Sequence, residues 1–168
     1  MITIRPERLE DRAEVHALNE QAFGSAVEAD LVDKLREACA GALSLVAEDE
    51  SGIIGHIFFS SVIIDDAKRT IEGMGLAPMA VRPDRQRQGV GSALVREGLD
   101  ILRSRESPFV VVLGHPEYYP RFGFEPASRR GVACQWEGVP DKAFMILVLD
   151  EAVLGGVSGI ARYRHDFS

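Results

Sequence analysis

The sequence has few cysteines, no long apolar run and no excess of positive charge. Cys39 and Cys134 are the only cysteines among 168 residues, and two isolated cysteines form neither a disulfide framework nor a zinc site. No apolar stretch approaches the roughly 20 residues that a membrane-spanning helix needs. We therefore expect two reduced thiols, no metal and no membrane partner.

Acidic residues outnumber basic ones, and the net charge is −7. A body of this charge repels nucleic acids and attracts cationic partners such as amines, so no nucleic-acid partner is expected. Met1 to Asp11 alternates charged and apolar residues and does not form a signal peptide. The expected location is the cytoplasm.

Length and composition favour one globular domain over residues 1–168. Chains of this length usually form a single domain, and 46% hydrophobic with 27% charged residues is ordinary for a folded protein. No repeat, linker or low-complexity segment divides the chain.

Apolar periodicity predicts a mixed order of helices and strands. Helices are predicted over Leu9–Phe23, Glu28–Ala38, Gly89–Ser104 and Glu117–Phe122. Strands are predicted over Met1–Pro6, Leu43–Ala47, Ile53–Ile64, Thr70–Val81, Phe109–Leu113 and Ala143–Leu149, with a C-terminal loop that ends in a short strand. This order favours an α+β fold.

The most informative stretch is Val81–Ser92, between a predicted strand and a predicted helix. Pro83 keeps Arg82 extended, so the helix begins later. Gly89 and Gly91 allow the backbone to approach a ligand closely. The first N–H groups of the helix lack partners within it and, together with the helix dipole, form an anion site.

Three arginines, Arg82, Arg85 and Arg87, crowd this helix start. Cations there oppose the dipole by about 0.3–1 kcal/mol each, which makes sense if a phosphate-bearing ligand lies among them. The alternative is a solvated loop in which the arginines pair with nearby acids. No Gly-Lys-Ser/Thr follows the glycines, and Leu94 stands where a dinucleotide site needs Gly or Ala, so both nucleotide motifs are excluded.

The segment Gln86-Arg87-Gln88-Gly89-Val90-Gly91 resembles the Q/R-x-x-G-x-G/A motif of the GCN5-related N-acetyltransferase (GNAT) family. The extended run before it and the amphipathic helix after it follow the family's order. Tyr119-Pro120-Arg121-Phe122-Gly123-Phe124 is similar to the family's Tyr-x-x-x-Gly-Phe element. The resemblance spans nearly the whole chain. It implies a single α+β domain with a mixed, mostly antiparallel twisted sheet flanked by helices and splayed between the strands ending at Val81 and Leu113.

The resemblance also implies acetyl-CoA as acetyl donor and an amine of a small molecule or protein as acceptor. Main-chain groups of the strand ending at Val81 would pair with the pantetheine arm, and the Met79 N–H would polarise the thioester carbonyl. The amides of the loop would hold the pyrophosphate. The implied cofactor-binding set is Met79, Ala80, Val81, Gln86, Arg87, Gln88, Gly89, Val90, Gly91 and Ser92. Dimerisation is common in the family, so a homodimer is considered.

Tyr119 would lie beside the thioester sulfur and is the candidate catalytic acid. The ordinary tyrosine pKa of about 10 exceeds the thiol pKa of about 8.5, so the hydroxyl retains a proton to offer where thiolate charge develops. The alternative is that Tyr119 packs against the cofactor without proton transfer. The neighbouring Tyr118 is assigned a pocket-lining role.

Other assignments stay open at this stage. Many family members carry Asn where this chain has Leu113–Glu117, and His115 in that segment is favoured as a capping or packing residue over a ligand contact. His56 is favoured as a structural residue. The general base is left open among Glu72, Glu28, Asp30 and an ordered water.

The acceptor is not encoded in the motif, because variable loops set it. The loops expected to do so are Gly24–Asp30, Asp65–Arg69 and Arg129–Pro140. Trp136 in the last loop either lines a substrate pocket or is buried against the sheet. The alternative function is an acyl-CoA-binding module without catalysis, which the presence of Tyr119 disfavours.

Overall fold

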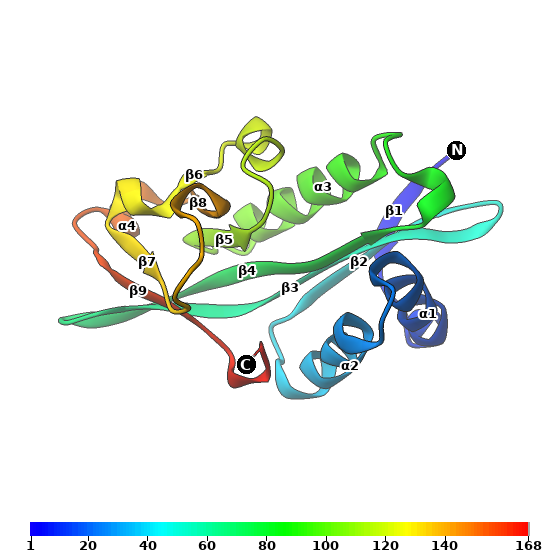
Figure 1. Cartoon of the computed structure of the whole chain (residues 1–168), viewed down its shortest axis with the longest axis horizontal. Coiled ribbons are helices and arrows are strands. Elements are labelled where there is room, and N and C mark those ends of the chain that lie inside the picture. Colours follow the sequence, from blue (N-terminus) through cyan, green and yellow to red (C-terminus); the bar gives the residue numbers. More distant parts are fainter. Residues whose placement is uncertain (168) are drawn as a thin grey trace. The chain divides into compact units, whose positions relative to one another are not determined.

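The structure is a computed structural model that describes residues 1–167, and its chain forms two compact units. The first unit comprises Met1–Ser60 and Ala77–Ile101, and the second comprises Ser61–Leu76 and the chain from Leu102 onward. The long strands β3 (Gly52–Asp66) and β4 (Arg69–Val81) each contribute residues to both units (Figure 1).

In the first unit, β1 (Thr3–Pro6) pairs antiparallel with β2 (Leu43–Asp49), and β2 pairs antiparallel with β3. Helices α1 (Arg12–Phe23) and α2 (Val27–Ala38) lie on one side of these strands, and α3 (Val90–Ser104) lies on the other (Figure 1). Both faces of the strands are therefore covered by helices.

The core of the first unit joins α1 to the sheet, and its buried residues include Val15, Leu18, Val46, Ile53 and Ala80. On the other side, two glycines allow α3 to lie close to β3. A Cβ atom on Gly55 would lie 2.9 Å from Val90 Cγ1, and one on Gly98 would lie 2.5 Å from the Phe59 ring. This close packing positions the start of α3 and the loop before it.

In the second unit, β4 pairs parallel with β5 (Phe109–Leu113), and β5 pairs antiparallel with β8 (Phe144–Val148). Strand β6 (Glu125–Pro126) also pairs with β8. The end of β3 pairs antiparallel with β9 (Gly159–Tyr163), which pairs parallel with β7 (Val132–Cys134). The buried core of this unit includes Val62, Ile64, Phe109, Val111, Phe144 and Ile146.

The predicted architecture, a mixed and mostly antiparallel sheet flanked by helices, is confirmed. Both cysteines are free thiols, as expected. The predicted splay beyond the β4–β5 ladder, which ends at Leu76 and Val112, stays a prediction. No helix within residues 1–167 combines the length and apolarity needed to cross a membrane.

Several short elements differ from the prediction. The helix expected over Glu117–Phe122 is a single 3-10 turn over Tyr119–Phe122. Strands β6 and β7 and the helix α4 (Glu151–Leu154) were not predicted. Elements of two to four residues are too short to show a periodic pattern. The short strand expected near the C-terminus is present as β9.

Candidate functional site

The loop between β4 and α3 contains two residues in the left-handed region. Arg87 and Gly89 have left-handed φ angles of 63° and 86°, and alternation of this kind forms anion-binding concavities from successive N–H groups. The amide of Ala93 donates to the Gly89 carbonyl at 3.0 Å. The amides of Val90 and Gly91 therefore precede the helix's own hydrogen-bond ladder, at the positive end of its dipole.

Two glutamine side chains hold the loop in this shape. Gln86 Nε2 donates to the Val81 carbonyl at 3.0 Å, and Gln88 Nε2 donates to the Asp84 carbonyl at 3.2 Å. The Val81 carbonyl, one of the groups expected to pair with pantetheine, is thus occupied by the loop itself. The glutamines contribute to the predicted site by shaping the backbone.

The three arginines of this loop divide into two kinds. Arg82 donates from Nε to Asp84 Oδ1 at 2.6 Å, and Arg85 forms an ion pair with Asp49. For Arg82 and Arg85 the structure therefore matches the alternative considered from the sequence, in which the loop arginines pair with nearby acids. Arg87 is exposed and has no hydrogen-bond or ionic partner within the described chain. It is the arginine that remains available to an anion.

Tyr119 belongs to the second unit and is buried, with 7% of its surface exposed. Its ring makes edge contacts with Tyr118 and Phe124, at centroid distances of 5.0 and 5.7 Å. Burial raises the pKa of Tyr119 to about 12. The hydroxyl is therefore protonated throughout the neutral range and is available as a hydrogen-bond donor.

The side chain of His56 is buried inside the first unit and acts as a structural residue, as favoured from the sequence. Asn19 Nδ2 lies 3.2 Å from its Nδ1, and Ser44 Oγ lies 2.8 Å from its Nε2. The Ser44 hydroxyl in turn donates to Glu7, which is paired with Arg36. Burial and the nearby Arg36 lower the pKa of His56 to about 3. A histidine with so low a pKa is a poor general base for removing a proton from the ammonium form of an acceptor amine.

The remaining candidates for the base belong to different units. Glu72 lies in the second unit, where its carboxylate accepts from Ser61 Oγ at 3.0 Å. Asp30 is exposed and Glu28 is half-buried on α2. Their assignment as a base stays a prediction.

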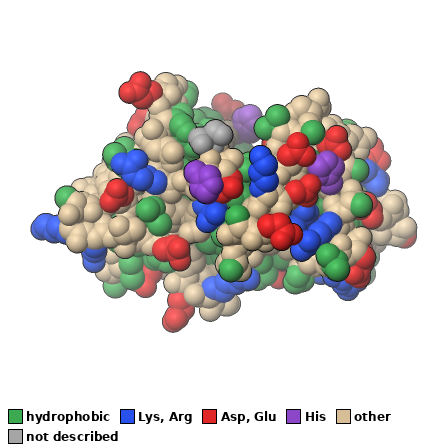
Figure 2. Space-filling view, turned by 90° about the horizontal axis from the view of Figure 1, so that it is seen from below, with side chains coloured by type: hydrophobic (Ala, Val, Ile, Leu, Met, Phe, Trp, Pro, Cys, Tyr) green, Lys and Arg blue, Asp and Glu red, His purple; other side chains and the backbone are tan. Residues whose placement is uncertain are grey.

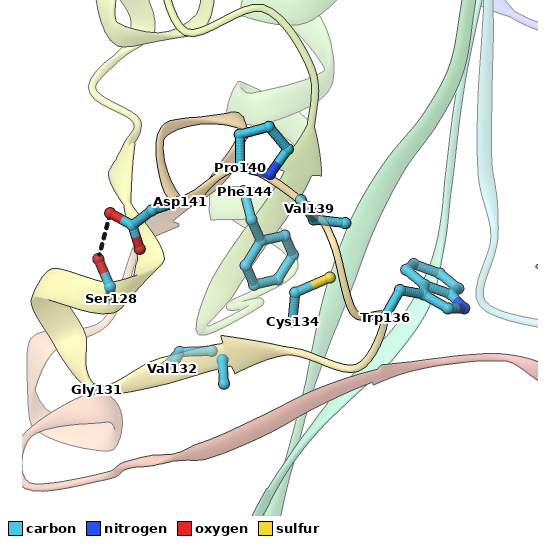
Figure 3. Close-up of a pocket in the computed structure, with 10 residues that line it drawn as sticks. Ser128, Gly131, Val132, Cys134, Trp136, Val139, Pro140, Asp141 and Phe144 are labelled. Atoms are coloured by element: carbon cyan, nitrogen blue, oxygen red, sulfur yellow. Dashed lines mark hydrogen bonds between the residues drawn. The ribbon is translucent and has the colours of Figure 1, made fainter.

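A pocket of about 370 Å³ lies within the second unit, at the loop expected to set acceptor choice (Figure 3). Val132, Phe144 and Cys134 give it an apolar floor, and the hydrogen-bonded pair Ser128 and Asp141 closes one side. Trp136 lines the pocket half-buried. Its ring is tilted against that of Tyr163 at a centroid distance of 4.9 Å, and its role in a substrate pocket stays a prediction.

Comparisons with known proteins identify the family. Residues 3–127 match the family described as acetyltransferase (GNAT) domain. The uncharacterized N-acetyltransferase YhbS of Escherichia coli K12 is 39% identical over 166 residues, which cover 98% of each chain. The chain belongs to the GNAT family.

Two solved GNAT structures share the fold over nearly the whole chain. Escherichia coli YhbS, crystallised with CoA, has a TM-score of 0.89 at 38% identity, covering 99% of this chain and 91% of that one. A GNAT acetyltransferase from Brucella melitensis, crystallised with acetyl-CoA, has a TM-score of 0.80 at 34% identity, covering 100% and 99%.

Around His115, where the chain departs from the GNAT pattern, the backbone forms a turn. The His115 carbonyl accepts from the amides of Tyr118 and Tyr119 at 3.1 and 3.4 Å, while its side chain is exposed. This supports the capping assignment. The pocket-lining role of Tyr118 stays a prediction. Its ring lies 4.4 Å from the guanidinium of Arg121.

Sequence reasoning missed Asp49 and Ser51, which contact Arg85 and Arg82, just ahead of the GNAT motif, from more than thirty residues earlier in the chain. The segment Glu48–Gly52 was interpreted only as a turn. No pattern within it indicates an arginine partner, because the contact depends on how β3 and β4 bring the two loops together.

Proposed function

We propose that this chain is an N-acetyltransferase that moves the acetyl group of acetyl-CoA to a primary amine. The observation that carries the proposal is the loop Gln86–Ser92, whose amides, left-handed residues and free Arg87 form an anion site at the start of α3. Family membership and the CoA and acetyl-CoA complexes of two relatives support it.

The cofactor is held mainly by backbone in this proposal. Main-chain groups of Ala80 and Val81 pair with the pantetheine arm, with the Val81 carbonyl shared with Gln86. The amides from Gln86 to Ser92 bind the pyrophosphate, and Arg87 adds one charge-assisted contact. Met79 N–H polarises the thioester carbonyl as an oxyanion donor.

Tyr119 serves as the hydrogen-bond donor to the departing thiolate. Its pKa of about 12 lies roughly 3.5 units above that of an ordinary thiol. Full proton transfer from Tyr119 to a thiolate of ordinary basicity would therefore cost about 5 kcal/mol. Desolvation of the thiolate raises the basicity of the sulfur as well, which brings the two groups closer to balance. Tyr119 thus stabilises developing negative charge and transfers its proton late.

The acceptor is an amine of a small molecule or a protein. Acidic and basic side chains are interspersed on the face shown in Figure 2, so the net charge of −7 is not gathered into one patch there. The electrostatic attraction of the protein for cationic amines is therefore not confined to one patch of that face. We also propose a cytoplasmic location, no nucleic-acid or membrane partner, and a homodimer as an assembly to be examined.

The first experiment is calorimetric titration with CoA and acetyl-CoA, followed by a thiol-release assay on a panel of amines. Micromolar binding together with acetyl-CoA-dependent thiol release on one amine is the expected result. Binding without release on any amine, and without acetylation of protein lysines, would favour the inactive acyl-CoA-binding module. Absence of binding to either ligand would refute the proposal.

A further inference from the structure

The turn between β2 and β3 holds the segment that precedes the pyrophosphate loop. Asp49 ends β2, and its side chain is only 4% exposed although it lies at a turn. One carboxylate oxygen pairs with the Arg85 guanidinium, and the other accepts from the amide and hydroxyl of Ser51 at 2.8 and 2.6 Å. The carboxylate is thus enclosed by donors from two separate loops.

Ser51 extends this contact to a second arginine. Its hydroxyl oxygen accepts from Arg82 Nη2 at 3.2 Å, and the same guanidinium also binds Asp84 through two bonds of 2.6 and 3.2 Å. The residues Asp49, Ser51, Arg82, Asp84 and Arg85 therefore form one connected network, which we call the loop latch. It joins the β2–β3 turn to the 3-10 turn Pro83–Arg85, immediately before Gln86.

The charge state of the latch is fixed. Hydrogen bonds from Ser51, and then the Arg85 charge, lower the pKa of Asp49 to about 2. The carboxylate is ionised at any pH at which the enzyme is assayed. An ionised, enclosed carboxylate binds a guanidinium more strongly than a neutral acceptor does. Arg85 is therefore held by Asp49.

We propose that Asp49 is a positioning residue for acetyl-CoA: through Arg85 and Ser51 it fixes the segment from which the pyrophosphate-binding amides begin. This inference rests on the proposed function. It assigns Arg82 and Arg85 to holding the loop, and it leaves Arg87 as the side-chain cation of the anion site. The GNAT loop is then organised before the cofactor arrives, which lowers the entropic cost of binding.

The test compares D49N, R85Q and the D49N/R85Q double variant in CoA titrations and acetyl-CoA kinetics. D49N should raise the Kd for CoA and the KM for acetyl-CoA about tenfold, the effect of losing one charge-assisted hydrogen bond. The kcat at saturating acetyl-CoA should stay within about twofold, because the reacting atoms are unaffected. R85Q should reproduce D49N, the double variant should be no worse than either, and R85K should recover part of the loss.

The adjacent E50Q variant is the matched control. Glu50 is exposed, carries the same charge in the same turn and contacts only the N-terminal amine, at 3.7 Å, among described residues. It should bind CoA like the unaltered chain. An R87Q variant should weaken binding independently, adding to D49N, and should reduce the dependence of Kd on salt.

Three results would overturn the latch. The first is unchanged CoA binding in D49N, and the second is tighter binding, which would mean that the released Arg85 contacts phosphate. The third is additive loss in the double variant, which would make Arg85 an independent ligand. Failure of the latch is distinguishable from failure of the proposed function. If the unaltered chain itself does not bind CoA, the proposed function is wrong and the latch with it. If it binds and D49N binds equally, only the latch fails. Thermal unfolding of each variant without CoA separates loss of folding from loss of positioning.

Discussion

Burial determines what Tyr119 can contribute to catalysis. A phenol with a pKa raised to about 12 stays protonated, so removing its hydroxyl should remove a donor without changing charge. We predict that Tyr119→Phe lowers kcat by about 100-fold, at the low end of the range for acid–base groups. CoA affinity should stay within about twofold, since the buried ring remains in place. Steady-state kinetics and CoA titration measure both.

Tyr118→Phe is the matched control for this change, because it removes the same group from the neighbouring ring. It should retain most of the turnover. The pH profile adds a separate check: kcat of the unaltered enzyme should show no loss from Tyr119 as pH rises through the ordinary tyrosine value of 10.0. Equal kcat in Tyr119→Phe and the unaltered enzyme would mean that Tyr119 only packs.

His56 should make the protein sensitive to acid. Its pKa falls from 6.5 to about 3 on folding, so below pH 6.5 the unfolded chain takes up a proton that the folded chain refuses. Stability is therefore lost as pH falls from about 6.5 toward 3. Between pH 7.5 and 5 the loss from this residue should be about 2 kcal/mol, measured by urea unfolding at the two pH values.

The variant His56→Gln should be less stable at pH 7.5 by about 1–3 kcal/mol, since the buried network is disturbed, but its pH dependence should be smaller. The exposed His115→Gln offers a matched surface change and should keep the full pH dependence. A slope that is the same in His56→Gln and the unaltered chain would show that other groups cause the acid sensitivity.

At this scale the sequence predicted the structural role of His56, and it offered acids as alternative partners of the loop arginines without saying which arginines would take them. Arg82, Arg85 and Arg87 are equivalent in the sequence, as three cations before a helix. Arg82 pairs with Asp84, two residues away, whereas Asp49 and Ser51 come near only because distant strands pair. Side-chain partners across a fold are not contained in local spacing.

Helix α3 packs closely against β3 at two glycines, one opposite the start of the helix and one near its middle. Gly55 on β3 faces Val90 and Leu94 of the first turn, and Gly98 of the third turn faces Phe59. Adding a methyl group at either position forces the helix away from the sheet, which costs about 1–3 kcal/mol. The two sites differ in their distance from the anion-binding amides.

We predict that Gly55→Ala weakens CoA binding more than Gly98→Ala does at comparable loss of stability. The first displaces the turn that carries the amides of Val90 and Gly91, whereas the second acts two turns away. In Gly98→Ala, the better helix propensity of alanine offsets up to about 1 kcal/mol of the cost. Urea unfolding and CoA titration of both variants measure the two effects. Equal affinity losses would indicate that α3 moves as a rigid rod.

Long periodic elements were predictable and short ones were not. The strands and helices that carry the cofactor motif, β4 and α3, agree with the sequence to within one residue at each end. In contrast, β7 has three residues and lies inside the segment interpreted as the loop Arg129–Pro140. Strand β7 is stabilised by its pairing with β9, which is a long-range contact. Its three residues are too few to show an alternation of apolar and polar side chains.

At the scale of the whole molecule, the division into two compact units bears on whether residues 1–168 unfold as one domain. The two units share β3 and β4 by chain continuity. Unfolding either unit alone would break a strand in the middle and expose the backbone groups of its remaining half. Each exposed polar group carries a penalty when its surroundings stay apolar. We therefore propose a single cooperative domain, in agreement with its length.

Two probes separate the units in one experiment. Trp136, the only tryptophan, reports on the second unit through its fluorescence, while far-UV circular dichroism is dominated by α1, α2 and most of α3 in the first. Both signals should give the same urea midpoint. CoA at 100 times its Kd should then add about 2.7 kcal/mol to both, although the pyrophosphate site proposed for it lies in the first unit alone. Separate midpoints, or a CoA-induced shift seen only by circular dichroism, would show two domains. In that case a ligand held by the Gln86–Ser92 loop would leave the stability of the Tyr119 unit unchanged.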